Sequence, residues 1–335
     1  MINIAVVGYG YWGPNLVRNL GETEGARVAV CCDLDVKRLA RAKLKHPGLE
    51  VTGDYGAVLA NRDIGAVAVA TPVHTHFDLA RRALEAGKHV LVEKSMTMRV
   101  DQAEELVALA KQKGLVLMVD HVFIYSPPVL KIKEIVDSGK LGKLFFIDSV
   151  RINLGLFQHD VNVVWDLAPH DLSIVDFLLG KLPRALSATG SAHTGNEIED
   201  VAYLNLDYGD GLIANFHVNW LSPVKVRSMM IGGSERSLIY NDMDSSEKIK
   251  VYDRGINVGE DPEKRRQVLI SYRSGDIWSP NVANAEPLGR LAAHFAECIA
   301  DGKTPISGGE SGLRIVKILD AAQRSIKAQG KKVML

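Results

Sequence analysis

Residues 2–22 read INIAVVGYGYWGPNLVRNLGE. A short apolar run leads into three glycines and then into a helix-like segment. The glycines have the spacing G-x-G-x-x-G and are Gly8, Gly10 and Gly13. Glycines placed in this way can make a tight turn, admit a pyrophosphate to the backbone and let the helix pack on the strand. The free N–H groups at the start of that helix would face the phosphates. The stretch therefore predicts a dinucleotide-binding unit.

Aromatic residues among the glycines leave a second interpretation open. Tyr9, Tyr11 and Trp12 could line or cover a cofactor groove, or they could form an aromatic turn in a core. The next apolar run, RVAVCC, favours the groove because Asp33 follows it about 20 residues after Gly13, where dinucleotide-binding units place an acidic residue.

The carboxylate of Asp33 is predicted to select the cofactor. It can accept hydrogen bonds from both ribose hydroxyls and would repel a 2′-phosphate, so it favours NAD over NADP. The alternative is a plain turn aspartate. Arg38, five residues later, could lie over the adenine, or it could attract a phosphate and weaken the preference.

Composition limits the class of protein. The chain has 335 residues, 47% of them apolar and 24% charged, which is enough for two globular domains. Lysine plus arginine and aspartate plus glutamate number 40 each without long runs of one sign, so no nucleic-acid or membrane partner is expected. With strand-sized apolar runs and no leader before Ile2, we expect a cytoplasmic protein. Cys31, Cys32 and Cys298 do not make a disulfide framework or a Cys-rich metal site.

The pattern of the sequence changes near residue 120. Before it, β-branched runs alternate with amphipathic segments, which predicts a parallel sheet with right-handed crossovers. After it, runs such as LIANFHVNW are mostly separated by turns, which predicts an antiparallel sheet. We expect an α/β fold with a doubly wound Rossmann domain over residues 1–121. An α+β domain for substrate binding and oligomerisation, with an open, mostly antiparallel sheet, should cover residues 122–335, and its closing helices should pack back on the fold. Helices are expected near Pro128–Ser138, Leu167–Gly180, Pro287–Asp301 and Gly309–Gln329.

Two predicted strand ends carry candidate residues. ATPVHTH, residues 70–76, lies at the carboxyl edge of the parallel sheet, where ligands bind in such folds. Its two histidines have no third ligand near, so no metal is expected. GKHVLVEKS ends the next strand with Lys94. Lys94 could donate to a sugar hydroxyl and favour loss of its proton during hydride transfer, or it could be an ordinary solvated lysine.

WDLAPHD, residues 165–171, places Asp166 and His170 four apart at the predicted start of a helix, hence on one face. The positive end of the helix would keep His170 neutral and able to accept a proton, while Asp166 orients it or the substrate. Alternatively, Asp166 only caps the helix, whose first turn holds Pro169, and His170 pairs with Asp171.

Two further runs hold cationic and amide groups on predicted strands. Arg151 and Asn153 lie two apart on one strand, and Lys225 and Arg227 lie two apart on another. Such groups could hold a phosphorylated or hydroxyl-rich ligand. They could equally be exposed strand residues or interface contacts.

Together these motifs resemble the glucose-fructose oxidoreductase, inositol dehydrogenase and rhizopine catabolism family, shortened to Gfo/Idh/MocA. GYGYWG, Asp33, ATPVHTH, AGKHVLVEKS and WDLAPHD occur in the family's order and spacing, and the resemblance covers essentially the whole chain. It implies a Rossmann domain followed by an open, mostly antiparallel sheet that often makes dimer or tetramer contacts. RINLG, WDLAPHD and NWLSPVKVR resemble a bacterial branch often associated with nucleotide-sugar and polysaccharide pathways.

The resemblance also implies roles for single residues. Lys94 matches the lysine of the family's Glu-Lys-Pro motif, which contacts cofactor and reactive hydroxyl. Asp166 and His170 match the Asp-x-x-x-His pair of the inositol-dehydrogenase-like branch, in which the histidine is the general base. The implied cofactor-binding residues are Gly8, Gly10, Tyr11, Trp12, Gly13, Asp33, Arg38, Thr71, Pro72, His76, Glu93 and Lys94. The implied substrate-binding residues are Arg151, Asn153, Trp165 and Arg227.

The chain departs from the family pattern at two positions. Ser95 stands where the family usually has proline, which could loosen the turn that aims Lys94. Ile124, in FIYSPP, stands where many members have arginine, which concerns the range of substrates.

The sequence thus predicts an NAD-dependent oxidoreductase acting on a secondary hydroxyl, at C3 of a nucleotide-activated hexose, in a homodimer or homotetramer formed through the C-terminal sheet. One alternative is an inositol or free-sugar dehydrogenase with the same groups. Another is a glycosidase that retains NAD and oxidises its substrate transiently. A third is a sensor that binds NAD and a partner, which Lys94, Asp166 and His170 argue against.

Overall fold

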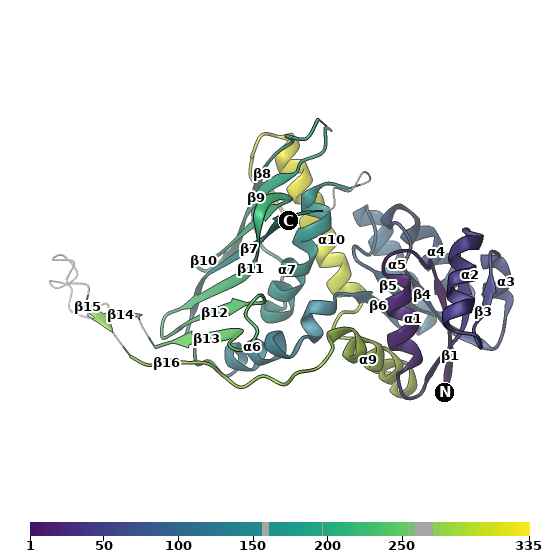
Figure 1. Cartoon of the computed structure of the whole chain (residues 1–335). Helices are drawn as coiled ribbons and strands as arrows, with labels where there is room; N and C mark the ends of the chain where they lie inside the picture. Colours follow the sequence, from purple (N-terminus) through teal and green to yellow (C-terminus); the bar gives the residue numbers. More distant parts are fainter. Residues whose placement is uncertain (156–160, 196, 254, 258–270, 274) are drawn as a thin grey trace. The chain divides into compact units, whose positions relative to one another are not determined.

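The computed structural model describes residues 1–155, 161–195, 197–253, 255–257, 271–273 and 275–335. The chain divides into two compact units (Figure 1). The first is Met1–Ser126 with Ala285–Asp320, and the second is Pro127–Asn284 with Ala321–Leu335. None of the helices in the described ranges combines the length and the apolar character that a membrane span needs.

The first unit is built on six parallel strands in the order β3-β2-β1-β4-β5-β6. The strands are β1 (Ile2–Val7), β2 (Ala26–Cys32), β3 (Glu50–Thr52), β4 (Ile64–Val69), β5 (His89–Glu93) and β6 (Leu117–Asp120). Strand order reverses between β1 and β4, which creates the topological switch point at which such sheets bind ligands. The predicted Rossmann fold is confirmed.

Helices connect the successive strands of this sheet. They are α1 (Gly13–Gly21), α2 (Val36–Lys45), α3 (Tyr55–Ala60), the short 3-10 helix η1 (Val73–Thr75), α4 (His76–Glu85) and α5 (Val100–Lys113). A second 3-10 helix, η2 (Val122–Tyr125), follows β6. Helix α1 shows why they form, because Leu16, Val17 and Leu20 lie on its buried face and pack towards β1 and β2.

Residues near the end of the chain complete the first unit. Helix α9 (Pro287–Asp301) packs on α1 and η2. The segment after it pairs with β6, since Val119 N donates to Ser307 O at 2.8 Å and Met118 bridges Gly308. Helix α10 (Gly309–Lys327) begins in the first unit and ends in the second. The sequence predicts a domain boundary after residue 121. The two observed units are divided differently, because the segment that pairs with β6 comes from a distant part of the sequence.

The second unit is a nine-stranded sheet in the order β16-β13-β12-β11-β7-β10-β9-β8-β17. The strands are β7 (Leu144–Leu154), β8 (Ala185–Ser191), β9 (Val201–Gly209), β10 (Leu212–Asn219), β11 (Leu221–Gly233), β12 (Ser237–Asn241), β13 (Ile249–Tyr252), β16 (Ile277–Trp278) and β17 (Val333–Met334). A separate hairpin joins β14 (Gly255–Asn257) and β15 (Ser271–Arg273). Among the described strands of the large sheet, only β7 and β10 pair in parallel, so the predicted mostly antiparallel sheet is confirmed.

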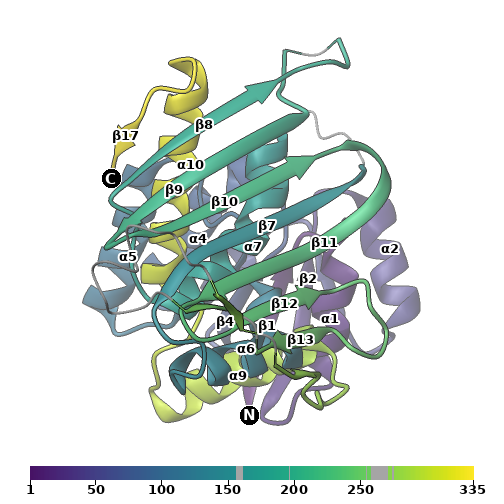
Figure 2. The same cartoon turned by 90° about the vertical axis from the view of Figure 1, so that its left-hand side faces the viewer.

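Helices cover one face of the second sheet. Helix α7 (Val163–Leu179) packs against β7, β9 and β10, and α6 (Pro127–Asp137) packs on α7 (Figure 2). Alternation along β7 turns Ile147, Ser149 and Arg151 towards this face, where all three are buried. Asp148 points to the opposite face, which no helix in the described part of the unit covers.

Helix α7 begins earlier than predicted. The Asn162 side chain accepts a hydrogen bond from Trp165 N at 3.1 Å and caps the helix. Pro169 therefore lies in the second turn, where it removes the hydrogen bond to Trp165 O. The predicted start near Leu167 is wrong, since the proline signal points to a later start than the asparagine cap. The helix ends as predicted, before Gly180 in the left-handed conformation at φ +64°.

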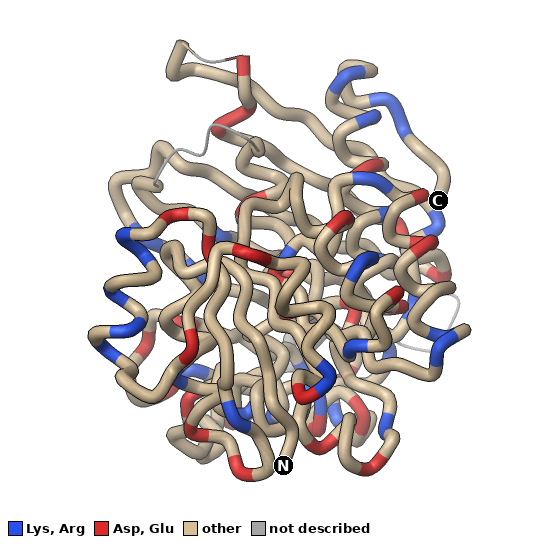
Figure 3. Tube along the Cα trace, turned by 90° about the vertical axis from the view of Figure 1, so that its right-hand side faces the viewer, with Lys and Arg blue, Asp and Glu red and all other residues tan. Residues whose placement is uncertain are grey.

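Charged residues of both signs are interspersed along the described chain on the face drawn in Figure 3. This arrangement agrees with the equal totals of 40 basic and 40 acidic residues.

Candidate active site

The glycine turn has no room for side chains at two of its three motif positions. Gly8 has φ +97°, and a Cβ atom there would lie 2.5 Å from Ala70 O. A Cβ atom on Gly13 would collide with Gly8 O. At Gly10 the nearest atom would be Arg38 Nη1 at 3.6 Å, so the turn can be approached at that residue. These are the conditions that the dinucleotide-binding motif requires.

Helix α1 starts directly after the turn. Its N-cap residue Trp12 makes no side-chain capping bond, and no acidic residue lies in its first turn. No side chain of that turn therefore neutralises the positive end of the helix, which suits an anion such as a pyrophosphate.

Asp33 follows β2 and is fixed by the backbone around it. Its Oδ2 accepts a hydrogen bond from Tyr9 N at 2.6 Å, and its Oδ1 accepts one from Asp35 N at 2.8 Å. Arg38 Nη1 lies 3.7 Å from Asp33 Oδ2, and Arg38 Nε lies 3.5 Å from Asp35 Oδ2. Because Arg38 already faces two carboxylates, a 2′-phosphate would have to compete with them for its charge.

The three aromatic residues of the turn lie in different environments. Tyr11 is 87% exposed, and Trp12 is partly exposed with its ring 6.5 Å from that of Tyr11. Tyr9 is 3% exposed and belongs to the core. The expectation that all three line the groove is therefore wrong for Tyr9, whose backbone N–H rather than its ring serves the site.

The end of β4 is tied to the end of β5 by His76. This residue is 1% exposed, with Nδ1 2.9 Å from Ser95 O and Nε2 2.8 Å from Thr71 O. Burial lowers the pKa of His76, and a neutral imidazole can donate to only one of these carbonyls. Direct contacts of Thr71, Pro72 and His76 with the cofactor stay predictions. Both ring nitrogens of His76 face backbone carbonyl groups.

No group of three or more His, Cys, Asp or Glu side chains in the described ranges could hold a metal ion.

The ends of β5 and β6 bring two carboxyl groups together. Glu93 lies opposite Asp120 in the register of the two strands, and Trp12 Nε1 donates to Asp120 Oδ2 at 2.7 Å. Burial and then the Asp120 charge raise the pKa of Glu93 well above its usual value, while burial raises that of Asp120 to about 6. Glu93 keeps some exposed surface as a residue, but its carboxyl group is enclosed by protein. Burial and the closeness of the two groups therefore oppose ionisation of both carboxyl groups at once.

Lys94 follows Glu93, and its charge lowers the pKa of both carboxyl groups against the effect of burial. His121 follows Asp120 and is 2% exposed. Burial and the charge of Lys94 lower the pKa of His121 to about 3, so its ring is neutral. Asp120 and His121 were not predicted as site residues, although MVDH ends a strand-like run at the same edge of the sheet as Glu93 and Lys94.

In the second unit, Asp166 and His170 lie one turn apart on the same face of α7, as their spacing predicts. Asp166 Oδ2 accepts a hydrogen bond from Trp220 Nε1 at 3.1 Å. The alternative in which Asp166 caps the helix is wrong, because Asn162 is the cap. His170 is the eighth residue of α7, too far from its start for the helix dipole to set its charge, so that argument for a neutral ring fails.

Arg151 lies in the core of the second unit. It is 2% exposed, and its Nε and Nη2 donate to the two carboxylate oxygens of Asp171 at 2.9 and 2.7 Å. Arg151 is therefore the charge partner of Asp171, and the alternative in which Asp171 pairs with His170 stays untested. Arg227 on β11 is the register partner of Arg151, and its Nη1 lies 3.4 Å from Asp242 Oδ2. The strand register places the two arginines next to each other. The pairing with Asp171 counts against Arg151 as a ligand for substrate, and its predicted role stays a prediction.

Asn153 and Trp165, the other two residues predicted to bind substrate, are partly exposed.

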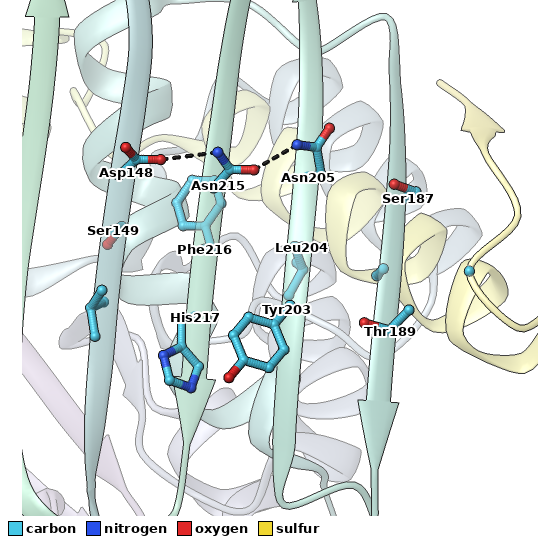
Figure 4. A pocket seen from close by; sticks show the side chains of 13 residues that line it. Asp148, Ser149, Ser187, Thr189, Tyr203, Leu204, Asn205, Asn215, Phe216 and His217 are labelled. Atoms are coloured by element: carbon cyan, nitrogen blue, oxygen red, sulfur yellow. Dashed lines mark hydrogen bonds between the residues drawn. The ribbon is translucent and has the colours of Figure 1, made fainter.

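A hollow of about 450 Å³ lies on the other face of the second sheet, opposite α7. Figure 4 shows Asn215 donating to Asp148 and Asn205 donating to Asn215, at 2.9 and 2.6 Å. The rings of Tyr203 and His217 stack there with centroids 4.3 Å apart. None of the residues predicted for catalysis or for binding lines this hollow, so we do not assign it to the active site.

Strand order, the glycine turn and the fixed carboxylate after β2 restrict the first unit to one class, the dinucleotide-binding α/β domains. The chain belongs to the GFO/IDH/MocA oxidoreductase family: residues 2–121 match the model of an oxidoreductase family with an NAD-binding Rossmann fold, and residues 129–239 match that of the GFO/IDH/MocA C-terminal domain. The resemblance seen in the sequence is thus confirmed, and the family it names is one of oxidoreductases with an NAD-binding Rossmann fold.

Three similar proteins illustrate the range of the family. The chain is 27% identical to 2,7-anhydro-N-acetylneuraminate hydratase of Mediterraneibacter gnavus, in a match that covers 64% of this chain and only 60% of that protein. It is 26% identical to the scyllo-inositol 2-dehydrogenase (NADP(+)) IolW of Bacillus subtilis, over 97% of this chain and 94% of the relative. The structure of UDP-N-acetylglucosamine 3-dehydrogenase GnnA from Acidithiobacillus ferrooxidans has the same fold, with a TM-score of 0.83, 22% identity and 98% of both chains covered.

The residues of the first unit fit a bound NAD. The approachable backbone at Gly10 and the uncapped start of α1 suit the pyrophosphate, and Asp33 suits the hydroxyls of the adenosine ribose. Lys94 and the carboxyl pair of Glu93 and Asp120 lie at the ends of β5 and β6, where the nicotinamide half of the cofactor would reach.

Replacement of Asp33 by alanine tests the assignment of the ribose site. Loss of a charged acceptor should weaken NAD binding about 10-fold to 100-fold and reduce the preference over NADP. Calorimetric titration with each cofactor measures both effects. Asp63→Ala, which removes an exposed carboxylate from a turn, should change neither. Equal affinities in wild type and Asp33→Ala would remove Asp33 from the cofactor site.

Replacement of Asp171 by asparagine tests whether Arg151 has a structural role. The change leaves a buried guanidinium without its charge partner, so the second unit should lose about 3–5 kcal/mol of unfolding free energy. Urea unfolding followed by circular dichroism measures the loss. Asp210→Asn, in an exposed pair with Arg184, should cost less than about 1 kcal/mol. A similar small cost for both variants would contradict the structural role.

Proposed function

We propose that this protein transfers a hydride between NAD and a secondary hydroxyl of a sugar, at C3 of a nucleotide-activated hexose. The observation that carries the proposal is the pair on α7, a carboxylate and an imidazole one turn apart with Asp166 held by Trp220. A proton acceptor of this kind is what alcohol oxidation requires in addition to the cofactor.

When bound, NAD supplies the hydride acceptor. The hydroxyl proton passes to an imidazole nitrogen of His170. Asp166 orients either the ring of His170 or the substrate. Lys94 donates a hydrogen bond to the same oxygen and stabilises the negative charge that develops on it. The hydroxyl carbon loses one hydride and its oxygen loses one proton, so the product is a ketone. In the reverse direction His170 returns the proton.

A nucleotide-activated substrate is supported by two observations. GnnA, which shares the fold over 98% of its chain, is named as a 3-dehydrogenase of UDP-N-acetylglucosamine. In this chain, Arg227 has a side chain 30% exposed and can offer a planar donor group to a diphosphate. We assign the sugar to Asn153 and Trp165. Arg151 lies on the same face of the sheet as Arg227 and is paired with Asp171.

The second candidate is an inositol or free-sugar dehydrogenase. It is favoured by the match to IolW, which extends over 97% of this chain. The same three groups, Lys94, Asp166 and His170, would perform the same chemistry on a ring hydroxyl without a nucleotide.

Absorbance of reduced nicotinamide at neutral pH separates these candidates. The purified protein would be incubated with NAD and, one at a time, with UDP-hexoses, dTDP-hexoses, free hexoses and inositols. Reduction confined to nucleotide sugars supports the proposal. Reduction by inositol or a free hexose replaces it with the second candidate. Release of an aglycone without net reduction would assign the protein to the NAD-retaining glycosidases.

His170→Ala tests the general base. Without the imidazole, turnover should fall by about 10²-fold to 10⁴-fold, while the dissociation constant of NAD should stay within about twofold. Stopped-flow absorbance and calorimetry measure the two quantities. His46→Ala, at the end of α2, serves as the matched control and should keep full turnover. Unchanged turnover in His170→Ala would exclude His170 as the base.

Copies of the chain are proposed to associate through the open face of the second sheet. Tyr203, Ile213 and Met230 are 54%, 42% and 38% exposed, and alternation along their strands places them on that face, where Tyr203 lines the hollow of Figure 4. Exposed apolar side chains on a broad sheet are typical of an interface between subunits.

The cytoplasmic location expected from the sequence stays a prediction.

Tyr203→Lys tests this association. A lysine in the middle of an apolar contact should shift the sedimentation coefficient from that of a dimer or tetramer to that of a monomer. Leu44→Lys, at a position 84% exposed on α2, should leave the wild-type assembly intact. A monomeric wild type, or an assembly that survives Tyr203→Lys, would contradict an interface on this face.

A further inference from the structure

The carboxyl pair of Glu93 and Asp120 lies in the first unit but has no role in the chemistry described so far. Asp120 is 1% exposed and accepts from Trp12, and Glu93 lies beside it at the end of the neighbouring strand. Two carboxylates in contact and out of water cannot both be charged, so they share one proton and one negative charge. Because burying that charge is costly, such pairs are more common at functional sites than in ordinary cores.

The position of Trp12 relates this pair to the cofactor groove. Trp12 belongs to the glycine turn after β1, while Asp120 ends β6, and the sheet order places β4 and β5 between these strands. The hydrogen bond therefore joins the glycine turn to the end of β6 at the carboxyl edge of the sheet. With Asp33 at the adenosine side, these strand ends are where the nicotinamide half of a dinucleotide lies.

We propose that Glu93 and Asp120 are positioning residues that hold Lys94 and Trp12 in place, and that their single negative charge makes the site bind oxidised nicotinamide more tightly than reduced nicotinamide. The inference rests on the NAD-dependent function proposed above. The oxidised ring carries a positive charge that the reduced ring lacks. A fixed carboxylate near the ring therefore favours the oxidised form, while Lys94 alone would disfavour it.

The titratable side chains around the pair are those of Lys94, His121 and Tyr125, and none of the three adds a negative charge. Lys94 faces the carboxyls from the end of β5, and His121, the residue after β6, is neutral. Tyr125 on η2 has a pKa raised by burial and stays neutral as well. Trp12, from the glycine turn, does not titrate in this range. As pH falls through about 6, Asp120 takes up a proton and the pair loses its charge, so the preference for NAD over NADH should fall in the same range.

The test compares the dissociation constants of NAD and NADH for the full-length protein at pH 8.0 and pH 5.5. In the wild type, the ratio of the constant for NADH to that for NAD should decrease about tenfold at the lower pH, as expected for one charge near the ring. The double variant Glu93→Gln/Asp120→Asn, which removes both carboxyl groups, should show the lower ratio already at pH 8.0 and little change with pH. Glu93→Gln, which leaves Asp120 charged, should keep the high ratio at pH 8.0.

One control variant and one fallback criterion keep the outcome clear. Asp101→Asn, in an exposed pair with Arg99, should behave as the wild type does. If the double variant Glu93→Gln/Asp120→Asn fails to fold, the wild-type pH dependence decides, and a ratio that is constant between pH 8.0 and 5.5 overturns the inference. A ratio in the double variant equal to that of the wild type at pH 8.0 also overturns it. Failure of the wild type to bind either form would instead contradict the proposed function itself.

Discussion

The backbone at the end of β1 passes too close to its neighbours to carry side chains. Gly8 lies against the carbonyl of Ala70 after β4, and Gly13 lies against the carbonyl of Gly8. This packing keeps the ends of β1 and β4 side by side and starts α1 immediately after the turn. It also fixes the path of the residues between the glycines, so that a backbone N–H meets Asp33 and an indole meets Asp120. Both ends of the cofactor groove depend on this one steric constraint.

The two units use buried carboxylates in opposite ways. Asp171 in the second unit has both oxygens bound by Arg151, which balances its charge and closes the pair to other ligands. Asp120 in the first unit lies beside Glu93, and burial raises the pKa of both carboxyl groups while the charge of Lys94 lowers it. The first arrangement stabilises a core, while the proposed role of the second is to keep a charge close to the cofactor.

Local signals predicted much of this structure. Asp33 and Lys94 follow β-branched runs, so their places at strand ends could be inferred from alternation and glycine spacing alone. Contacts between distant residues could not be inferred in this way. Trp12 and Asp120 are 108 positions apart, and each looks ordinary in its own segment. Arg151 has the alternation of any strand residue, and only the packing of α7 on β7 shows that it faces a carboxylate rather than substrate.

Transfer of deuterium tests the central claim most directly. The protein would be incubated with NAD and a UDP-hexose labelled with deuterium at C3, and the nicotinamide would be analysed by mass spectrometry. The account predicts reduced nicotinamide one mass unit heavier than NADH, and a keto sugar that has lost its label. Reduced nicotinamide without deuterium, or NAD left unchanged beside an intact sugar, would contradict it.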